Sequence, residues 1–236
     1  MAWSVVGAHG ATANTTTSLN LARTAGTIGN LIVIGGSVGN SAAGAFTGAT
    51  PISDTQSNVW HTFTGMPFHD ATNGATVVGW WARAINTSAT TITINSNVAS
   101  AFMIMELSEF TGGVNASPLD QVDFTRGNST NPTSATFTPT FNDELIWCFG
   151  IDSITDMGNI DGTKATKGSD DSFQDWSEYR ILSGRAGVGM TAAFAGTIGA
   201  WNLVIGTFNP AAAAGDTQEW LSRSVVRQTR AVNPSY

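Results

Sequence analysis

Acidic side chains are the residues of this chain that come nearest to a catalytic pattern. Glu106 and Glu109 lie in one apolar segment, and glycoside hydrolysis requires two carboxylates that flank a single bond. Residues three apart in a strand, however, point to opposite faces of the sheet. The two glutamates therefore cannot flank one substrate, and spacing gives Asp54 and Asp70 no partner. We expect no catalytic residues and no enzymatic activity.

Few residues of the chain could serve as metal ligands or as a nucleophile. His9, His61 and His69 lack the spacing of a zinc site, and Cys148 is the single cysteine. We place His9 at the end of a strand, His61 inside a strand, and Cys148 in the core. The segment Asp152–Asp175 carries six aspartates but not the ordered ligands of an EF-hand. We interpret it as a long polar loop with solvated acids, and calcium binding by this loop stays an open alternative. No metal site and no cofactor are predicted.

The composition favours a folded protein with a neutral surface. Charged residues make up 11% of the chain, against about 25% in typical domains. The 8 Trp and 12 Phe give the chain enough apolar surface to fold. A surface rich in Ser, Thr and Asn with few charges suits packing against neighbouring subunits. The net charge of -7 argues against a nucleic-acid partner.

Targeting signals are missing from the sequence. No stretch reaches the roughly 18 consecutive apolar residues of a membrane span. The first residues have no charged region followed by a long apolar run, so we expect no signal peptide and synthesis in the cytoplasm.

Short segments rich in β-branched and aromatic residues, separated by Gly, Asn, Asp, Ser and Pro, predict strands throughout. Gly35-Gly36 and Gly112-Gly113 are interpreted as turns that follow strands. The predicted strands are Ser4–Ala8, Thr16–Leu21, Asn30–Gly35, Val59–Phe63, Thr76–Ile85, Thr90–Asn95, Phe102–Phe110, Thr133–Thr140, Glu144–Ile151, Trp176–Leu182, Met190–Phe194 and Trp201–Phe208.

The order of strand types repeats once along the chain. A Thr-rich strand, an apolar strand beginning at Asn30, and the strand around Trp80 are followed by two more strands ending near Phe110. Similar types recur between Thr136 and Phe208. Two halves that cannot each close a core predict an all-β fold: a two-sheet antiparallel β-sandwich, jelly-roll-like, built from two similar halves. We assign residues 1–209 to this domain and 210–236 to a C-terminal extension.

The C-terminal extension is the predicted docking arm. It combines basic and apolar side chains, and its candidate contact residues are Trp220, Arg223, Arg227 and Arg230. A basic arm on an acidic body suits docking on an acidic neighbouring subunit. A frayed terminus with solvated charges explains the same residues equally well.

Tryptophans offer a second kind of contact. Alternation puts one ring of the adjacent Trp80 and Trp81 in the core and the other outward or between sheets, where a glycan or a protein could bind. Core packing accounts for most of the seven that could form such a sugar-stacking platform: Trp60, Trp80, Trp81, Trp147, Trp176, Trp201 and Trp220.

Three motifs resemble those of a diffuse group of β-sandwich proteins found in structural gene clusters of tailed bacteriophages and in some bacterial surface proteins. Patterns such as Gly-Asp-Leu-Leu-Val, Asp-x-x-Gly-Asn-x-Trp and Glu-Phe-x-Gly recur in that group. The matching segments are Asn30–Ile34, Asp54–Trp60 and Glu109–Gly112, with Asn30 in place of Asp and Ser57 in place of Gly. The resemblance covers roughly residues 1–150 and implies a fold without assigning functional residues.

The resemblance implies a virion structural protein. The expected role is a capsid decoration or cement protein that forms a homo-oligomer, with a trimer as one form, and binds other virion proteins such as the major capsid protein. The alternative is a carbohydrate- or receptor-binding module of a tail fibre or of a cell-surface adhesin. The expected location is the virion.

Overall fold

The computed structural model describes residues 3–14, 16–39, 42–98, 101–113, 117–160, 163–164, 166–170, 176–184 and 192–211, without the side chains of 152–170, 176 and 192–198. Regular structure in these ranges consists of antiparallel strands and no helix, which confirms the predicted all-β sandwich. None of the described residues forms a helix long and apolar enough to cross a membrane.

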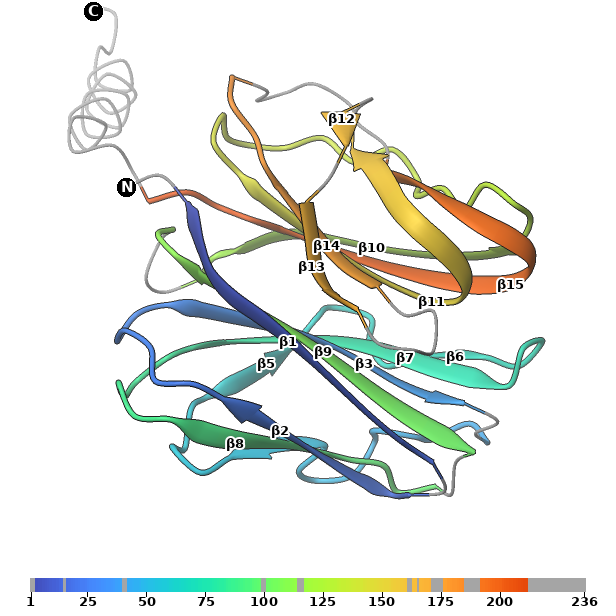
Figure 1. Ribbon diagram of the computed structural model, residues 1–236, viewed down its shortest axis with the longest axis horizontal. Coiled ribbons are helices and arrows are strands. Elements are labelled where there is room, and N and C mark those ends of the chain that lie inside the picture. The colour runs from blue at the N-terminus through green and yellow to red at the C-terminus, as the bar shows by residue number, and fades with distance from the viewer. Residues whose placement is uncertain are drawn as a thin grey trace, which may run out of the picture.

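The strands form three sheets, one more than predicted (Figure 1). Sheet A has the order β1-β9-β3-β7-β5, with β6 also paired to β7, and consists of β1 (Ser4–Asn14), β9 (Phe102–Thr111), β3 (Leu31–Gly39), β7 (Ala75–Arg83), β5 (Trp60–Thr62) and β6 (Phe68–Asp70). Sheet B has the order β2-β8-β4 and consists of β2 (Ser18–Arg23), β8 (Thr90–Asn95) and β4 (Ile52–Asp54).

Sheet C has the order β10-β15-β11-β14-β13, with β12 paired to β11. It consists of β10 (Leu119–Asn128), β15 (Ala192–Phe208), β11 (Leu145–Ile160), β14 (Trp176–Ile181), β13 (Thr166–Asp170) and β12 (Thr163–Lys164).

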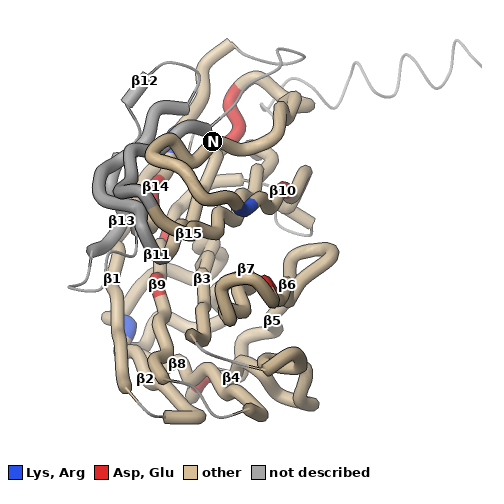
Figure 2. Tube along the Cα trace, turned by 90° about the vertical axis from the view of Figure 1, so that its right-hand side faces the viewer, with Lys and Arg blue, Asp and Glu red and all other residues tan. Residues whose placement is uncertain are grey.

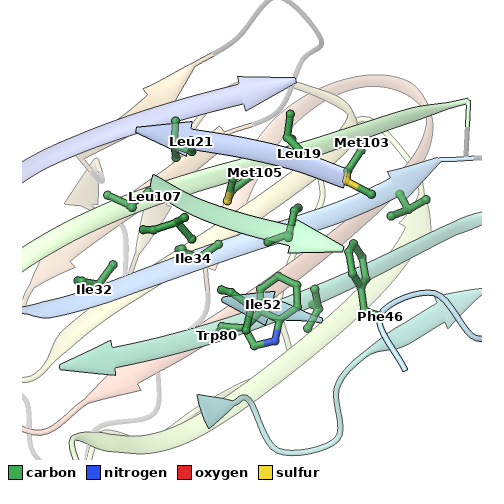
Figure 3. Packing of buried hydrophobic residues seen from close by; sticks show 14 of the residues in the cluster. Leu19, Leu21, Ile32, Ile34, Phe46, Ile52, Trp80, Met103, Met105 and Leu107 are labelled. Carbon is green, nitrogen blue, oxygen red and sulfur yellow. The ribbon is translucent and has the colours of Figure 1, made fainter. Parts of the chain in front are cut away.

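Sheet A is the middle layer, because each of its faces packs on another sheet (Figure 1). Strand alternation sends Ile32 and Ile34 toward sheet B and Leu31 and Val33 toward sheet C. Figure 3 shows the first of these cores, where side chains of sheets A and B meet. The second core joins sheet A to Leu145, Trp147, Phe149, Val204 and Phe208 of sheet C.

The two halves share one strand order, which confirms the predicted repeat for its three apolar strands, β3, β7 and β9 in the first half and β11, β14 and β15 in the second. The other two predicted members of the second half are not separate strands, because Thr133–Thr140 forms no strand and residues 192–194 belong to β15. The first half arranges its strands as β1-β9-β3-β7, and the second as β10-β15-β11-β14. Leu31 pairs with Phe110 in sheet A just as Leu145 pairs with Phe208 in sheet C. Each half therefore supplies one four-stranded unit, and the two units bury their apolar faces against each other.

The halves differ in what covers the outer face of each unit. Sheet B covers sheet A, whereas segment 129–144 lies against sheet C and contributes Phe137 to an apolar cluster there. The predicted strand Thr133–Thr140 is wrong: only isolated bridges occur at 133 and 137. Side chains and loop carbonyls hold this segment instead, since the Ala135 N–H donates to Asp123 and Gln121 donates to the Thr138 carbonyl.

The prediction of a turn at Gly35-Gly36 is also wrong, because both residues lie within β3. A Cβ on Gly35 would lie 2.3 Å from the Phe149 ring, and one on Gly36 would lie 2.7 Å from the Trp80 ring. Glycine is required here because an aromatic ring fills the space of its missing side chain. The turn predicted at Gly112-Gly113 is confirmed, since both residues have positive φ.

The predicted loop Asp152–Asp175 is largely strand. Strands β11 and β15 continue as a pair past the sandwich, with Ile154 opposite Gly196 and Ile160 opposite Ala192, and β12 and β13 follow. The ladder satisfies the backbone hydrogen bonds of this polar sequence, so strand formation there does not need an alternating apolar face. The aspartate side chains of the segment, and with them any calcium cage, lie outside the described residues.

Candidate contact surface

Nearly all of the predicted docking arm, residues 212–236, lies outside the described residues. Its candidate contact residues, Trp220, Arg223, Arg227 and Arg230, lie outside the described residues. The positions of the other polar and apolar candidates are described, and they divide into buried groups that join the sheets and exposed groups at the rim and end of the sandwich.

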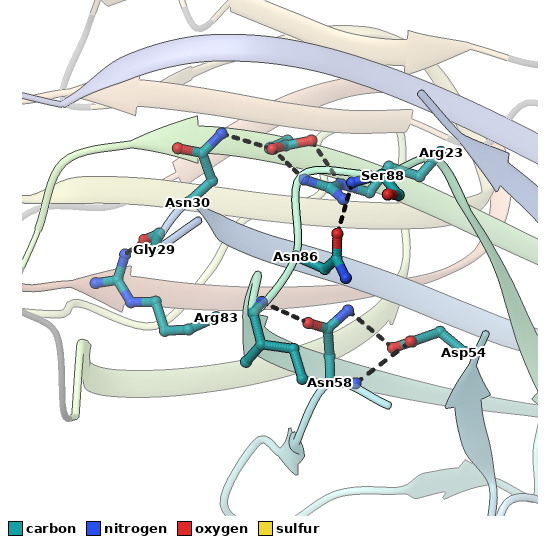
Figure 4. A network of polar contacts seen from close by, with 10 residues as sticks. Arg23, Gly29, Asn30, Asp54, Asn58, Arg83, Asn86 and Ser88 are labelled. Carbon is teal, nitrogen blue, oxygen red and sulfur yellow. Dashed lines mark hydrogen bonds and ion pairs between the residues drawn. The ribbon is translucent and has the colours of Figure 1, made fainter. Parts of the chain in front are cut away.

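Glu106 and Glu109 point to opposite faces of sheet A, as predicted. Glu109 faces sheet B, where Arg23 of β2 donates two hydrogen bonds to its carboxylate, at 2.8 and 2.6 Å (Figure 4). The Asn30 amide donates a third at 2.6 Å. Glu106 pairs in register with Gly35, whose missing Cβ faces Phe149 of sheet C. The Arg23–Glu109 pair is buried and joins sheets A and B.

The Asp54–Trp60 motif is a structural loop. One Asp54 carboxylate accepts hydrogen bonds from the Gln56 N–H, the Asn58 N–H and amide, and the Trp60 indole. Ser57 has φ +59°, which explains why the related pattern has glycine at this position. The side-chain oxygen Oδ1 of Asn58 in turn accepts a hydrogen bond from the Ile85 N–H, which ties the loop to the residues that follow β7 (Figure 4).

Asp70 joins sheet A to sheet C. Its buried carboxylate accepts from Arg126 of β10 at 2.6 Å, and also from the Thr72 N–H and the Asn73 amide. The Arg126 guanidinium lies 5.4 Å from the centre of the Phe68 ring. Asp54 and Asp70, for which sequence spacing offers no catalytic partner, therefore both have structural partners.

Glu144 is a buried carboxylate with a raised pKa. Burial, with a smaller contribution from the negative charge of Asp120, raises its pKa from 4.5 to about 7. The Phe141 N–H donates a hydrogen bond to the carboxylate at 2.7 Å, which favours the charged form and opposes this rise only in part. Glu144 occupies the position in sheet C that Asn30 has in sheet A, since each precedes the first paired leucine.

We expect the stability of the protein to fall between pH 5 and pH 8 because of Glu144. Its pKa is higher in the folded than in the unfolded chain, so the folded state binds the proton more tightly and loses stability as the pH rises through about 7. Glu144→Gln removes this dependence and should stabilise the protein at pH 8 by on the order of 2 kcal/mol. Urea unfolding at both pH values measures the effect; a variant with an unchanged pH slope would exclude Glu144 as its source.

The histidines and the cysteine have structural environments. His9 lies inside β1 and not at the end of a strand, because β1 continues to Asn14. His61 lies in β5 as predicted and stacks on Trp81 at 4.2 Å, while His69 bonds to Thr76. Cys148 is buried as predicted, and burial raises its pKa well above the usual value. No group of three potential metal ligands occurs in the part of the chain that the structure describes.

Most described tryptophans belong to the core. Trp80 packs between sheets A and B and Trp81 between sheets A and C, so the predicted alternation is confirmed. Trp147 and Trp201 are buried, and Trp60 is half-buried with its indole on Asp54. The side chains of Trp176 and Trp220 lie outside the described residues, and the remaining members of the proposed sugar-stacking platform do not share one exposed face.

Three large apolar side chains are exposed at one end of the sandwich. Ile28, Val59 and Ile85, which we call the end patch, are 63%, 65% and 52% exposed. Backbone bonds hold their loops together, since the Gly29 N–H donates to the Ala84 carbonyl and Ile85 is tied to Asn58. Clustered exposed apolar side chains are typical of protein contact sites.

No family model matches the sequence, and no curated protein matches it. Among solved structures, the crystal structure of the major capsid protein P2 from Bacteriophage PM2 is similar over 88% of this chain and 100% of that chain, with 10% sequence identity and a TM-score of 0.30. A likeness of that degree carries no argument about assembly.

Proposed function

We propose that this chain is a non-catalytic structural protein of a bacteriophage virion, with capsid decoration or cement as its role and the surface of the particle as its location. The end patch carries the proposal, because three exposed apolar side chains on tied loops form a preorganised contact site. The low charge of the chain and the resemblance of its motifs to those of phage structural proteins support the same role. Its partners are then its own subunits and the major capsid protein.

Particle binding tests the proposal. Particles assembled from the neighbouring structural genes, with this gene deleted, are mixed with purified protein and sedimented. We expect saturable binding and a higher temperature of particle disruption. Val59→Asp places a charge in the end patch and should weaken binding by about tenfold or more. Thr62→Asp changes an exposed residue of strand β5 that lies outside the end patch. It is the control and should bind normally. Protein that stays in the supernatant at every concentration would refute the virion role.

A further inference from the structure

Strand β1 is the longest edge strand in the described sheets, and unlike the edge strands β2, β10 and β13 it carries no charged residue. It has 11 residues and contains no Asp, Glu, Lys, Arg or Pro. The opposite edge of sheet A consists of β5 and β6, with three residues each, and β4 of sheet B also has three. Strand β10 of sheet C carries Asp120, Asp123 and Arg126. Short length and charge are the means by which proteins protect sheet edges, and β1 has neither.

The outer side of β1 offers backbone hydrogen bonds. Within the described residues β1 pairs with β9 alone, from Ser4 opposite Thr111 to Asn14 opposite Phe102. In an antiparallel pair, alternate residues direct their N–H and C=O groups away from the partner strand. Val5 and Val6 are also 42% and 49% exposed. Figure 2 shows β1 at the rim of the molecule. This edge is complementary to an extended strand.

We infer that β1 pairs antiparallel with β1 of a second copy of this chain, so that two sheets A join into one continuous sheet across a two-fold axis. Each copy has a net charge of -7, and two such chains approach most readily where neither carries a charge. A two-fold contact needs a self-complementary surface, which an antiparallel strand edge provides. The inference rests on the proposed function and specifies the subunit contact within it.

The middle residue of β1 is His9, so a full overlap of Ser4–Asn14 places His9 of the two copies opposite each other. The register shift between Val5 and Gly7 falls toward the ends of that overlap and leaves its middle regular. A positive charge at position 9 then meets its own copy directly, and like charges on opposite strand residues are destabilising. Position 9 is therefore where a single substitution tests the pairing most directly.

Sedimentation and amide hydrogen exchange of the full chain test the inference. We expect the wild-type protein to self-associate at micromolar concentration, and exchange of β1 amides to slow as the concentration rises. His9→Lys should raise the dissociation constant about tenfold or more. His61→Lys, on the short opposite edge of sheet A, is the matched control and should associate like the wild type.

Three outcomes would overturn the inference: a wild-type monomer at all concentrations, association without slower exchange in β1, or equal effects of the two lysine variants. The exchange measurement uses the wild-type protein and so holds even if His9→Lys misfolds. None of these outcomes affects particle binding through the end patch, so failure of β1 pairing is distinguishable from failure of the virion role.

Discussion

Arg23→Met is expected to destabilise the folded protein by about 3–5 kcal/mol, because it leaves the buried carboxylate of Glu109 without its counter-charge. Glu109 is 3% exposed and would retain only the hydrogen bond from Asn30. Methionine preserves most of the side-chain volume between sheets A and B, so the loss measures charge and not a cavity. Urea unfolding followed by tryptophan fluorescence gives the free energy of unfolding.

A second substitution separates charge from packing. Glu109→Gln in the Arg23→Met background keeps an oxygen that accepts from Asn30 but removes the negative charge, and should recover about 2 kcal/mol or more. Arg126→Met is the comparison: Arg126 is 47% exposed and Asp70 keeps its bonds from the Thr72 N–H and the Asn73 amide, so the loss should be smaller than for Arg23→Met. If the double variant is no more stable than Arg23→Met, the unpaired charge is not the cause.

Each half has a buried carboxylate beside its first leucine–phenylalanine pair, Leu31–Phe110 or Leu145–Phe208, but at a different position. We call this place the corner of the half. In sheet A the corner pairs Asn30 with Glu109, and in sheet C the equivalent residues are Glu144 and Thr207. The first carboxylate has Arg23 as its partner and is a stabilising ion pair. The second has the Phe141 N–H as its donor, and burial raises its pKa to about 7. Equivalent places in the two halves thus hold an Arg–Glu ion pair in one half and a carboxylate with a raised pKa in the other.

The fold was predictable where the residue pattern of a single strand indicates a strand without reference to its partners. Thr90–Asn95 alternates apolar and polar residues, and β8 has the predicted bounds. The repeat was predictable because each half repeats its apolar strands in the same order. Strand β10 was missed because Asp120, Asp123 and Arg126 interrupt it, and its pairing with β15 spans most of the second half. The composition of a segment does not show which distant strand it pairs with.

The contact surface was less predictable than the fold. From the sequence alone Arg23 would be expected at the surface, because nothing near it identifies its partner: Glu109 lies 86 positions away. Strand β1 was predicted to end at Ala8, since Gly10 and alanines follow and favour strands weakly. The absence of charge along residues 4–14 was the available signal. Exposure of Val59 and Ile85 depends on how three loops meet, which hydropathy alone does not show.

Gly35→Ala is expected to destabilise the protein by about 3 kcal/mol, although it adds one methyl group. The new Cβ would lie 2.3 Å from Cγ of Phe149, and that part of the ring cannot move without shifting the backbone of β11. Gly35 and Phe149 are equivalent residues of the two halves, each four positions past the paired leucine. A half with phenylalanine at this position packs only on a half with glycine, so the two units are complementary and not interchangeable.

A double-mutant cycle distinguishes this clash from a general intolerance of β3. Phe149→Ala alone should cost about 3–5 kcal/mol through the cavity it leaves. In the double variant the methyl group added at position 35 occupies part of that cavity, so the combined loss should fall short of the sum by about 2 kcal/mol. Gly48→Ala is the control, because nothing lies within 4 Å of its added Cβ, and it should change stability by less than about 0.5 kcal/mol. Additive losses at positions 35 and 149 would mean that the ring does not fill the space of the missing side chain.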